Sequence, residues 1–183
     1  MADTLPIEQF TSMYRRHYPA VLAYAASQVG RQSAEEVVSD TFMVAWRRLD
    51  DIPIPPLPWL LGVTRNHVRQ LRRTADRHRT AVMRDGTQAW WERAVADVAD
   101  VVADRATVIR AAVTLSDHDR EVLTLIAWHG LDATKAAKVL GCSAPTFMVR
   151  LHRARRRLEK AMDTESRQQS DCPIRTLPTA LCR

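Results

Sequence analysis

The 183-residue sequence is poor in the features that mark several large classes of protein. It has three cysteines, Cys142, Cys172 and Cys182, and none stands in CxxC spacing, so we expect neither a zinc site nor a disulfide framework. The sequence assigns no role to Cys172 or Cys182. No apolar run approaches the roughly 20 residues of a membrane span, and residues 1–10 lack the basic and apolar regions of a signal peptide. We therefore expect a cytoplasmic protein that does not enter a membrane.

Glycine and aromatic residues are also scarce. Five Gly and three Phe stand beside many Ala, Leu, Val and Arg, and no clear run of alternating β-branched residues occurs. This composition favours helices over sheets. Catalytic signatures are missing as well, since the sequence shows no Walker loop, Ser-centred elbow, metal-ligand cluster or paired carboxylates. We expect an all-α protein that is not an enzyme and has no catalytic residue, no bound metal and no cofactor.

Charge is plentiful but unevenly placed along the chain. The formal net charge is +6, and residues 65–84 carry seven Arg against one Asp. Residues 141–160 carry five Arg and one Lys against one Glu, whereas residues 85–120 hold seven acids against four Arg. Two separated basic blocks predict two contacts with nucleic acid. Duplex DNA would repel the acidic segment between them, so that segment needs another neighbour.

A helix-turn-helix pattern occupies residues 131–160. Asp132 can cap a first helix, Gly141 can end it in the left-handed conformation, and Ser143 can cap a second helix. The second helix carries an apolar and a polar stripe at helical spacing: the first is Phe147, Leu151, Ala154 and Leu158, and the second is Thr146, Arg150, Arg153 and Arg157. The polar stripe predicts contact with DNA phosphates, although a solvated helix face gives the same pattern.

The N-terminal half predicts three helical regions. The first is expected to kink or break at Pro19, because proline removes a helical hydrogen bond. The second begins with a capping box formed by Ser33 and Glu36. A loop with four prolines then leads into a third helix over residues 59–84.

These helices divide the chain into two small helical domains joined by a flexible acidic linker, the C-terminal domain being the helix-turn-helix. We expect the domains at residues 1–84 and 105–163, the linker at 85–104 and a polar tail at 164–183. The linker contains the paired Trp90 and Trp91, so we expect it to dock only where it is given a surface.

Three segments, in this order, resemble the small two-domain sigma factors of bacterial RNA polymerase, the extracytoplasmic-function group of the sigma-70 family. AEEVVSDTFMVAWRRL at residues 34–49 is similar to their helix that binds core polymerase. PWLLGVTRNHVRQLRR at residues 58–73 resembles their −10 promoter segment, and residues 115–158 resemble their −35-reading domain. One helix-turn-helix is shared by many regulators, but three segments in this order are specific.

The resemblance implies a sigma factor that recognises the −10 and −35 promoter elements and opens the duplex for transcription initiation. Core RNA polymerase and promoter DNA would be its partners, with an anti-sigma factor as a further candidate. Core-polymerase binding is expected at Glu35, Glu36, Val38, Asp40 and Phe42. Contact with the −10 DNA is expected at Arg65, Asn66, Arg69, Arg72 and Arg73. Contact with the −35 DNA is expected at Ser143, Thr146, Met148, Val149, Arg150 and Arg153.

The sequence departs from the family pattern in two places. The loop before the −10 helix is dense in proline, which leaves its base preference open. Met148 and Val149 stand where relatives often have a polar or basic pair, so contact with a thymine methyl and packing on a partner protein both stay open there. A stand-alone helix-turn-helix regulator is the alternative function, and it would bind duplex DNA without polymerase.

Overall fold

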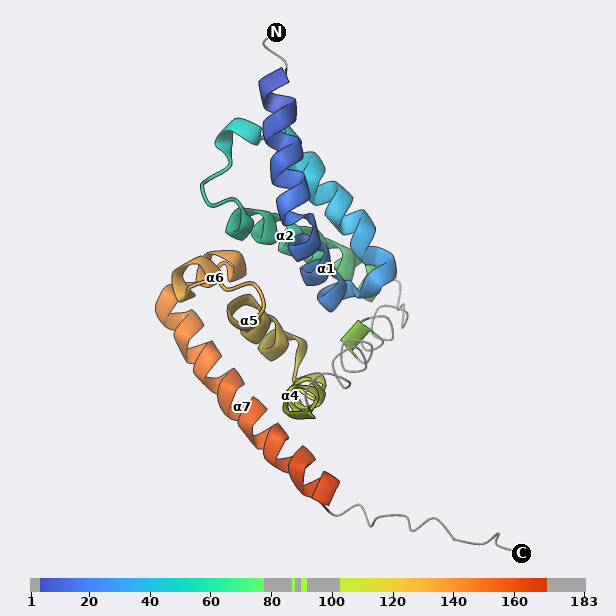
Figure 1. Cartoon of the computed structure of the whole chain (residues 1–183), viewed down its shortest axis with the longest axis vertical. Coiled ribbons are helices and arrows are strands. Elements are labelled where there is room, and N and C mark those ends of the chain that lie inside the picture. The colour runs from blue at the N-terminus through green and yellow to red at the C-terminus, as the bar shows by residue number, and fades with distance from the viewer. Residues whose placement is uncertain (1–3, 78–86, 88–89, 92–102, 171–183) are drawn as a thin grey trace, which may run out of the picture.

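The computed structural model describes residues 4–77, 87, 90–91 and 103–170, and every element in this part of the chain is a helix. The elements are α1 Thr4–Arg47, the 3-10 helix η1 Leu49–Asp51, α2 Leu57–Arg77, α4 Ala103–Val113, α5 Asp117–Ala127, α6 Ala133–Leu140 and α7 Ala144–Ser170. Figure 1 shows α2 between α1 and the α5–α6 pair, with α7 along the outer edge. The expected all-α fold is confirmed.

The helix α1 consists of two helical segments that meet at Gly30. Gly30 has φ 76° and ψ 165°, a conformation that is open to glycine and closed to residues with a Cβ. The chain turns back on itself there, so that the two segments lie side by side (Figure 1). The break expected at Pro19 is wrong, because the helix passes through this residue. Pro19 is exposed, so water can bond to the carbonyl that loses its helical partner.

Close packing of α2 on the second segment of α1 forms the core of the N-terminal half. Thr41 and Thr64 are fully buried, and their hydroxyl oxygens lie 3.2 Å apart across the two helices. Each hydroxyl also lies 2.8 Å from the carbonyl oxygen four residues earlier, so neither is left without a partner. Leu60 and Leu61 are 0 % exposed beside them. This packing fixes one side of α2 and leaves its other sides for different contacts.

Local caps define the helix-turn-helix, as the sequence predicts. The Asp132 carboxylate accepts a hydrogen bond from the Lys135 backbone N–H at 2.8 Å, and the Ser143 hydroxyl accepts one from the Thr146 N–H at 3.3 Å. Between the two helices Gly141 has φ 65° and ψ 40°, the left-handed C-cap conformation. Phe147, Leu151 and Ala154 then carry the apolar face of α7 into the core.

A single apolar core runs through both halves of the molecule. Buried residues of α1 and α2 belong to the same cluster as those of α5, α6 and α7, including Tyr24, Leu61, Val122, Leu140 and Phe147. Most of the expected linker lies outside the described residues. Of the five linker residues that are described, Trp91 is only 2 % exposed. The helix α7 extends to Ser170, so residues 164–170 of the expected tail are helical.

Candidate nucleic-acid interface

The outer face of α7 presents most of the residues expected to read the −35 DNA. Ser143, Thr146 and Arg153 are exposed, and Arg150 is half-buried. The side chains of Met148 and Val149 are 50 % and 52 % exposed, which makes them the most apolar part of this surface. In the described part of the chain no acid lies within ion-pairing distance of Arg150 or Arg153. The face is therefore a cationic surface with a short apolar strip at the beginning of the helix.

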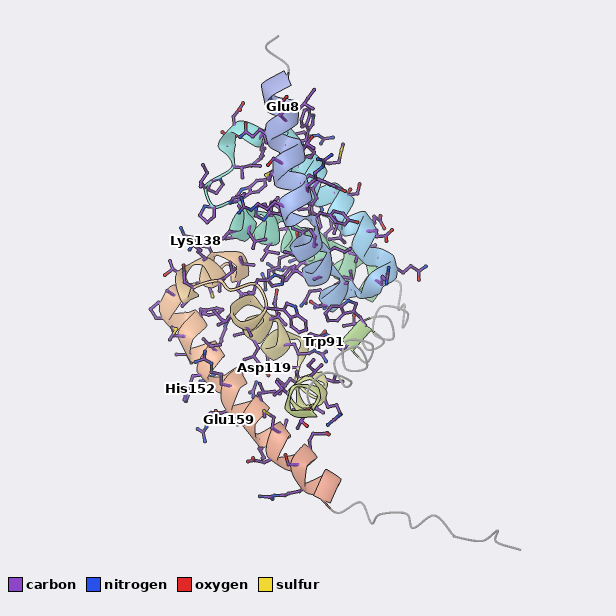
Figure 2. All side chains as sticks on the ribbon, in the orientation of Figure 1. Glu8, Trp91, Asp119, Lys138, His152 and Glu159 are labelled. Carbon is purple, nitrogen blue, oxygen red and sulfur yellow. The ribbon has the colours of Figure 1, made fainter. Side chains whose placement is uncertain are left out.

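One arginine of the polar stripe is used inside the molecule. The Arg157 Nη1 lies 2.7 Å from the Asp119 Oδ2, and the Ser116 hydroxyl donates to the same carboxylate oxygen at 2.7 Å. Burial raises the pKa of Asp119, but these two hydrogen bonds outweigh it, so the net pKa lies below the usual value. Figure 2 shows Asp119 where α5 faces α7. Arg157 thus ties α7 to the cap of α5.

The helix α2 divides its five expected −10 residues between two faces. Asn66, Arg69 and Arg73 are exposed and line an open polar hollow together with Gln70 and Thr74. An asparagine amide offers both a donor and an acceptor to a base edge, and the two arginines suit phosphates. This face can therefore meet a nucleic-acid strand without any change in the fold.

Arg65, on the adjacent side of α2, is bound to the C-terminal half. Its Nε lies 2.7 Å from the Glu121 Oε1, its Nη2 lies 3.5 Å from the Glu121 Oε2, and its Nη1 donates to the Leu140 carbonyl at 3.3 Å. The buried Tyr24 hydroxyl donates to the Glu121 Oε1 at 2.6 Å. Burial disfavours the charged guanidinium, but the hydrogen bond and the charge of Glu121 outweigh this and raise the pKa of Arg65. Burial raises the pKa of Tyr24 well above its usual value, and the negative charge of Glu121 is the second cause of this increase.

Arg72 lies on the same inward face, two helical turns further along. Its Nη2 donates to the Gln28 carbonyl oxygen at 2.6 Å and lies 3.4 Å from the Asp117 Oδ2. The sequence grouped Arg65 and Arg72 with the three exposed residues because all five are polar residues of one amphipathic helix. Their separation depends on α5, whose position no local pattern reveals.

The second segment of α1 exposes its acids and buries its apolar residues. Glu35, Glu36 and Asp40 are exposed, whereas Val38 and Phe42 are 2 % and 3 % exposed and belong to the chain's own core. Val38 and Phe42 therefore have almost no surface to offer a partner in this conformation. Two apolar side chains that the sequence reasoning missed, Met43 and Trp46, are 50 % and 45 % exposed. Met43 follows Asp40 by three residues, and that helical spacing was a usable signal.

A tryptophan cluster joins the linker to both halves. The Trp91 indole Nε1 donates to the Ser27 carbonyl of α1 at 3.4 Å, and its ring lies edge-on to Trp128 with centroids 6.2 Å apart. The Arg120 guanidinium of α5 lies 5.7 Å from the centroid of the Trp91 ring. Figure 2 places Trp91 beside the junction of the two halves. The sequence predicted that the linker needs a surface, but not that this surface is inside the same chain.

The described residues show neither a metal-binding cluster nor a membrane-spanning helix. They contain no group of three or more His, Cys, Asp or Glu side chains placed to hold a metal ion. None of their helices is both long enough and apolar enough to cross a membrane.

Comparison with known proteins assigns both halves. The family model of Sigma-70 region 2 matches residues 13–78, and that of Sigma-70 region 4 matches residues 105–158. The chain is 34% identical over 173 residues to the RNA polymerase sigma factor CnrH of Cupriavidus metallidurans, which covers 86% of this chain and 88% of that protein. It is 32% identical over 157 residues to the RNA polymerase sigma factor NccH of Alcaligenes xylosoxydans xylosoxydans, with 81% and 84% covered.

Two solved structures share the arrangement of helices. The sigma factor RpoE in complex with the anti-sigma factor NepR, from Bartonella quintana, has a TM-score of 0.60 and 26% identity, covering 84% of this chain and 96% of that chain. The structure of CnrH in complex with the cytosolic domain of CnrY has a TM-score of 0.59 and 28% identity, covering 85% and 88%.

Proposed function

Because this chain belongs to the sigma-70 family of RNA polymerase sigma factors, we propose that its two arginine-rich helices recognise the −10 and −35 elements of promoters while the chain is bound to core polymerase. It is a sigma factor of transcription initiation, and the chemistry of RNA synthesis belongs to the polymerase. The observation that carries the proposal is the presence of regions 2 and 4 in one chain, each with a helix rich in arginine. The site of action is the cytoplasm.

The −35 element is read by the N-terminal part of α7. Ser143, Thr146, Arg150 and Arg153 supply hydrogen bonds to phosphates and base edges, and each base-edge contact is worth about 1 to 3 kcal/mol. Met148 and Val149 are exposed beside them and suit the methyl group of thymine. A recognition helix with an apolar strip at its start favours elements that contain thymine.

The −10 element is held by the exposed face of α2. Asn66 contacts the edge of an unstacked base, and Arg69 and Arg73 contact the backbone of the same strand. Extruding a base costs a few kcal/mol, so these contacts must offset that cost for the duplex to stay open. The three residues are exposed together along one polar hollow, which is the support for assigning them one task.

Core polymerase binds the acidic face of α1. Glu35, Glu36 and Asp40 give this face its charge, and Met43 adds an exposed apolar side chain next to them. An interface with an apolar centre and charged surroundings is typical of specific protein contacts. We assign the apolar part of the contact to Met43 rather than to Val38 and Phe42, since those two are buried in the chain's own core.

An anti-sigma factor is a further partner. RpoE, which this chain resembles over most of its length, is described in complex with the anti-sigma factor NepR, and CnrH in complex with the cytosolic domain of CnrY. This chain exposes large apolar side chains in both halves, Trp46 and Trp128 among them, which a partner of that kind could cover.

In vitro transcription with purified core polymerase on genomic fragments tests the function. We expect transcripts whose start sites share two short sequence blocks, one near −10 and one near −35. Charge reversal at Glu36 and Asp40 to Lys should abolish most transcription and weaken core binding, whereas Glu159→Lys on the distal part of α7 should leave core binding unchanged. An inactive wild-type chain that binds duplex DNA without polymerase would instead identify a stand-alone regulator.

A further inference from the structure

We propose that the described conformation is a self-inhibited state, in which Glu121 of region 4 occupies Arg65 of region 2 and so withholds it from nucleic acid. The inference rests on the proposed function, because it concerns how the −10 surface becomes complete. Glu121 lies on α5 and Arg65 on α2, 56 positions apart in the chain. Their contact exists only while the two halves are packed together.

The Glu121 carboxylate takes the place that a phosphate would need. Both carboxylate oxygens face the guanidinium, at 2.7 Å from Nε and 3.5 Å from Nη2, and the Leu140 carbonyl occupies Nη1 at 3.3 Å. A guanidinium binds carboxylate and phosphate in the same two-pronged geometry. The Arg65 side chain is only 15 % exposed, so a nucleic-acid strand cannot reach it beside Glu121. The two anions must compete for one cation.

Tyr24 makes this contact a defined latch. Its hydroxyl is buried, donates to the same Glu121 oxygen at 2.6 Å and comes from α1, so three helices meet at one carboxylate. A buried charge is tolerated only when it is paired and hydrogen-bonded, and here Tyr24 and Arg65 together give both carboxylate oxygens a partner. The latch therefore favours one relative placement of the two halves over others.

A second, weaker contact lies beside the latch. Arg72 bridges the Gln28 carbonyl of α1 and Asp117 of α5, with Arg72 and Asp117 35 % and 53 % exposed. Asp117 also pairs with Arg120 of its own helix. Because Asp117 is solvated and shared, it holds Arg72 less firmly than Glu121 holds Arg65. The acids of α5 thus face both inward arginines of α2.

Trp91 closes the junction from the side of the linker. It is 2 % exposed, its indole N–H donates a hydrogen bond to the Ser27 carbonyl of α1, and the Arg120 guanidinium of α5 lies against its ring. A side chain that contacts both halves loses part of its surroundings when they separate. Opening therefore exposes Trp91 at the same time as it releases Arg65 and removes Asp117 from Arg72, which gives the transition an optical signal.

Closure reduces nucleic-acid binding without abolishing it. Asn66, Arg69 and Arg73 stay exposed in the closed state, so the chain keeps part of its −10 surface. Full binding requires the open state, and the apparent affinity is lowered by the fraction of molecules that are open. Any change that weakens the latch should raise the affinity of the isolated chain.

The test compares Glu121→Gln with Glu159→Gln in the full chain. Both variants remove one negative charge, but Glu159 is exposed on α7 (Figure 2) and makes no contact with α2. The probe is a fluorescein-labelled single-stranded DNA 20-mer, and its binding is followed by anisotropy at several salt concentrations. Glu121→Gln should bind about five- to tenfold more tightly than wild type, with a salt slope steeper by about 0.7 because Arg65 gains one phosphate. Glu159→Gln should change the affinity less than about twofold.

Two further measurements separate release of Arg65 from other causes. Small-angle scattering should show a larger radius of gyration for Glu121→Gln and an unchanged one for Glu159→Gln, and Trp emission should shift to the red in the first variant alone. In the Arg65→Ala background, adding Glu121→Gln should give no further gain in affinity. The proposal would be overturned if Glu121→Gln still raised the affinity in the Arg65→Ala background. It would also be overturned if the Glu121→Gln chain were as compact as wild type and bound DNA no more tightly than Glu159→Gln.

If Glu121→Gln does not fold, the milder Asp117→Asn variant provides a second test. It should loosen only the Arg72 contact and raise the affinity about two- to threefold; wild-type affinity and an unchanged radius would count against the latch. None of these readouts involves polymerase. Failure of the wild-type chain to direct transcription would therefore overturn the proposed function and leave the latch result standing, while an absent latch in an active sigma factor would overturn this inference alone.

Discussion

The helices α2 and α7 are both rich in arginine, yet they place this residue in different surroundings. In α7 the arginines at 153, 155 and 156 are exposed, and only Arg157 is tied to a buried acid. In α2 Arg69 and Arg73 are exposed, whereas Arg65 is held by Glu121 of the other half and Arg72 by Gln28 of its own half and Asp117 of the other. An arginine-rich helix therefore does not by itself present all its charge to DNA.

The cause of the difference is the number of sides on which each helix packs. The helix α7 lies on the outer edge and buries one stripe, Phe147, Leu151 and Ala154. The helix α2 packs on α1 with one side and faces α5 and α6 with another. A helix enclosed on two sides keeps only its remaining sector for a ligand. The binding capacity of α2 thus depends on whether the two halves are together.

Replacing Arg65 by Ala should give the largest effect on stability in this comparison. The Glu121 carboxylate would stay buried with only Tyr24 as a partner, which costs about 3 to 4 kcal/mol of the free energy that holds the packed halves together. Arg69→Ala, one turn away on the exposed face, should change it by less than about 0.5 kcal/mol. Urea unfolding followed by circular dichroism measures both. Equal midpoints for the two variants would show that the two faces of α2 do not differ.

Acidification should weaken the junction beside α2 before it affects α7. His129 lies against Tyr24, with ring centroids 5.8 Å apart, and burial lowers its pKa from 6.5 to about 4. The unfolded chain therefore takes up this proton first, and stability falls as the pH drops from about 6.5 to about 4, by about 3 kcal/mol in all. The pKa of Asp119 lies below its usual value of 3.8, so the contribution of Asp119 to stability is lost only at a pH below that window.

His129→Gln provides the control for this pH dependence. The substituted side chain does not titrate, so the stability of the variant should stay flat over the window in which wild type loses stability. Unfolding by urea at pH 7, 5.5 and 4.5 is sufficient to compare them. The same slope in both proteins would assign the acid sensitivity to carboxylates and leave His129 without a role.

Much of the local structure could be predicted from the sequence, because it is written in neighbouring residues. The caps at Asp132 and Ser143 and the left-handed Gly141 each depend on a few adjacent positions, and all three occur as expected. The first helical region was expected to kink or break at Pro19, whereas the only non-helical residue within α1 is Gly30. Proline always removes one helical hydrogen bond, but the helix continues where water can replace that bond. The sequence did not show that Pro19 is exposed.

The nonlocal part of the site could not be predicted in the same way. The sequence identified Arg65 and Asn66 as one group, but the partner that separates them, Glu121, is 56 positions from Arg65. Trp91 is buried by residues of α1 and α5 that no spacing connects to it. Periodicity shows which side of a helix is polar. It does not show which polar residues will meet a second helix.

Replacing Arg153 by Ala should affect DNA binding and leave stability almost unchanged. The exposed side chain has no acidic partner in the described part of the chain, so its removal should change the free energy of unfolding by less than about 0.5 kcal/mol. Affinity of the polymerase holoenzyme for a promoter duplex should fall by about 2 kcal/mol if Arg153 contacts a base edge. Gel-shift titrations on promoters with and without the −35 block distinguish a base contact from a phosphate contact, since only the former loses its effect when the block is absent.

Among the arginines that pair with a buried acid, the smallest effect on stability should come from Arg157, the one arginine of α7 that resembles the inward arginines of α2. Its ion pair with Asp119 has a buried acid but a guanidinium side chain that is 61 % exposed, so solvent screens it and Ser116 still bonds to the carboxylate. Arg157→Ala should therefore lower the free energy of unfolding by only about 1 kcal/mol, and Arg156→Ala by less than about 0.5 kcal/mol. A loss at Arg157 as large as that at Arg65 would mean that exposure of the guanidinium does not decide the strength of these pairs, and the distinction between the two helices would then depend on geometry alone.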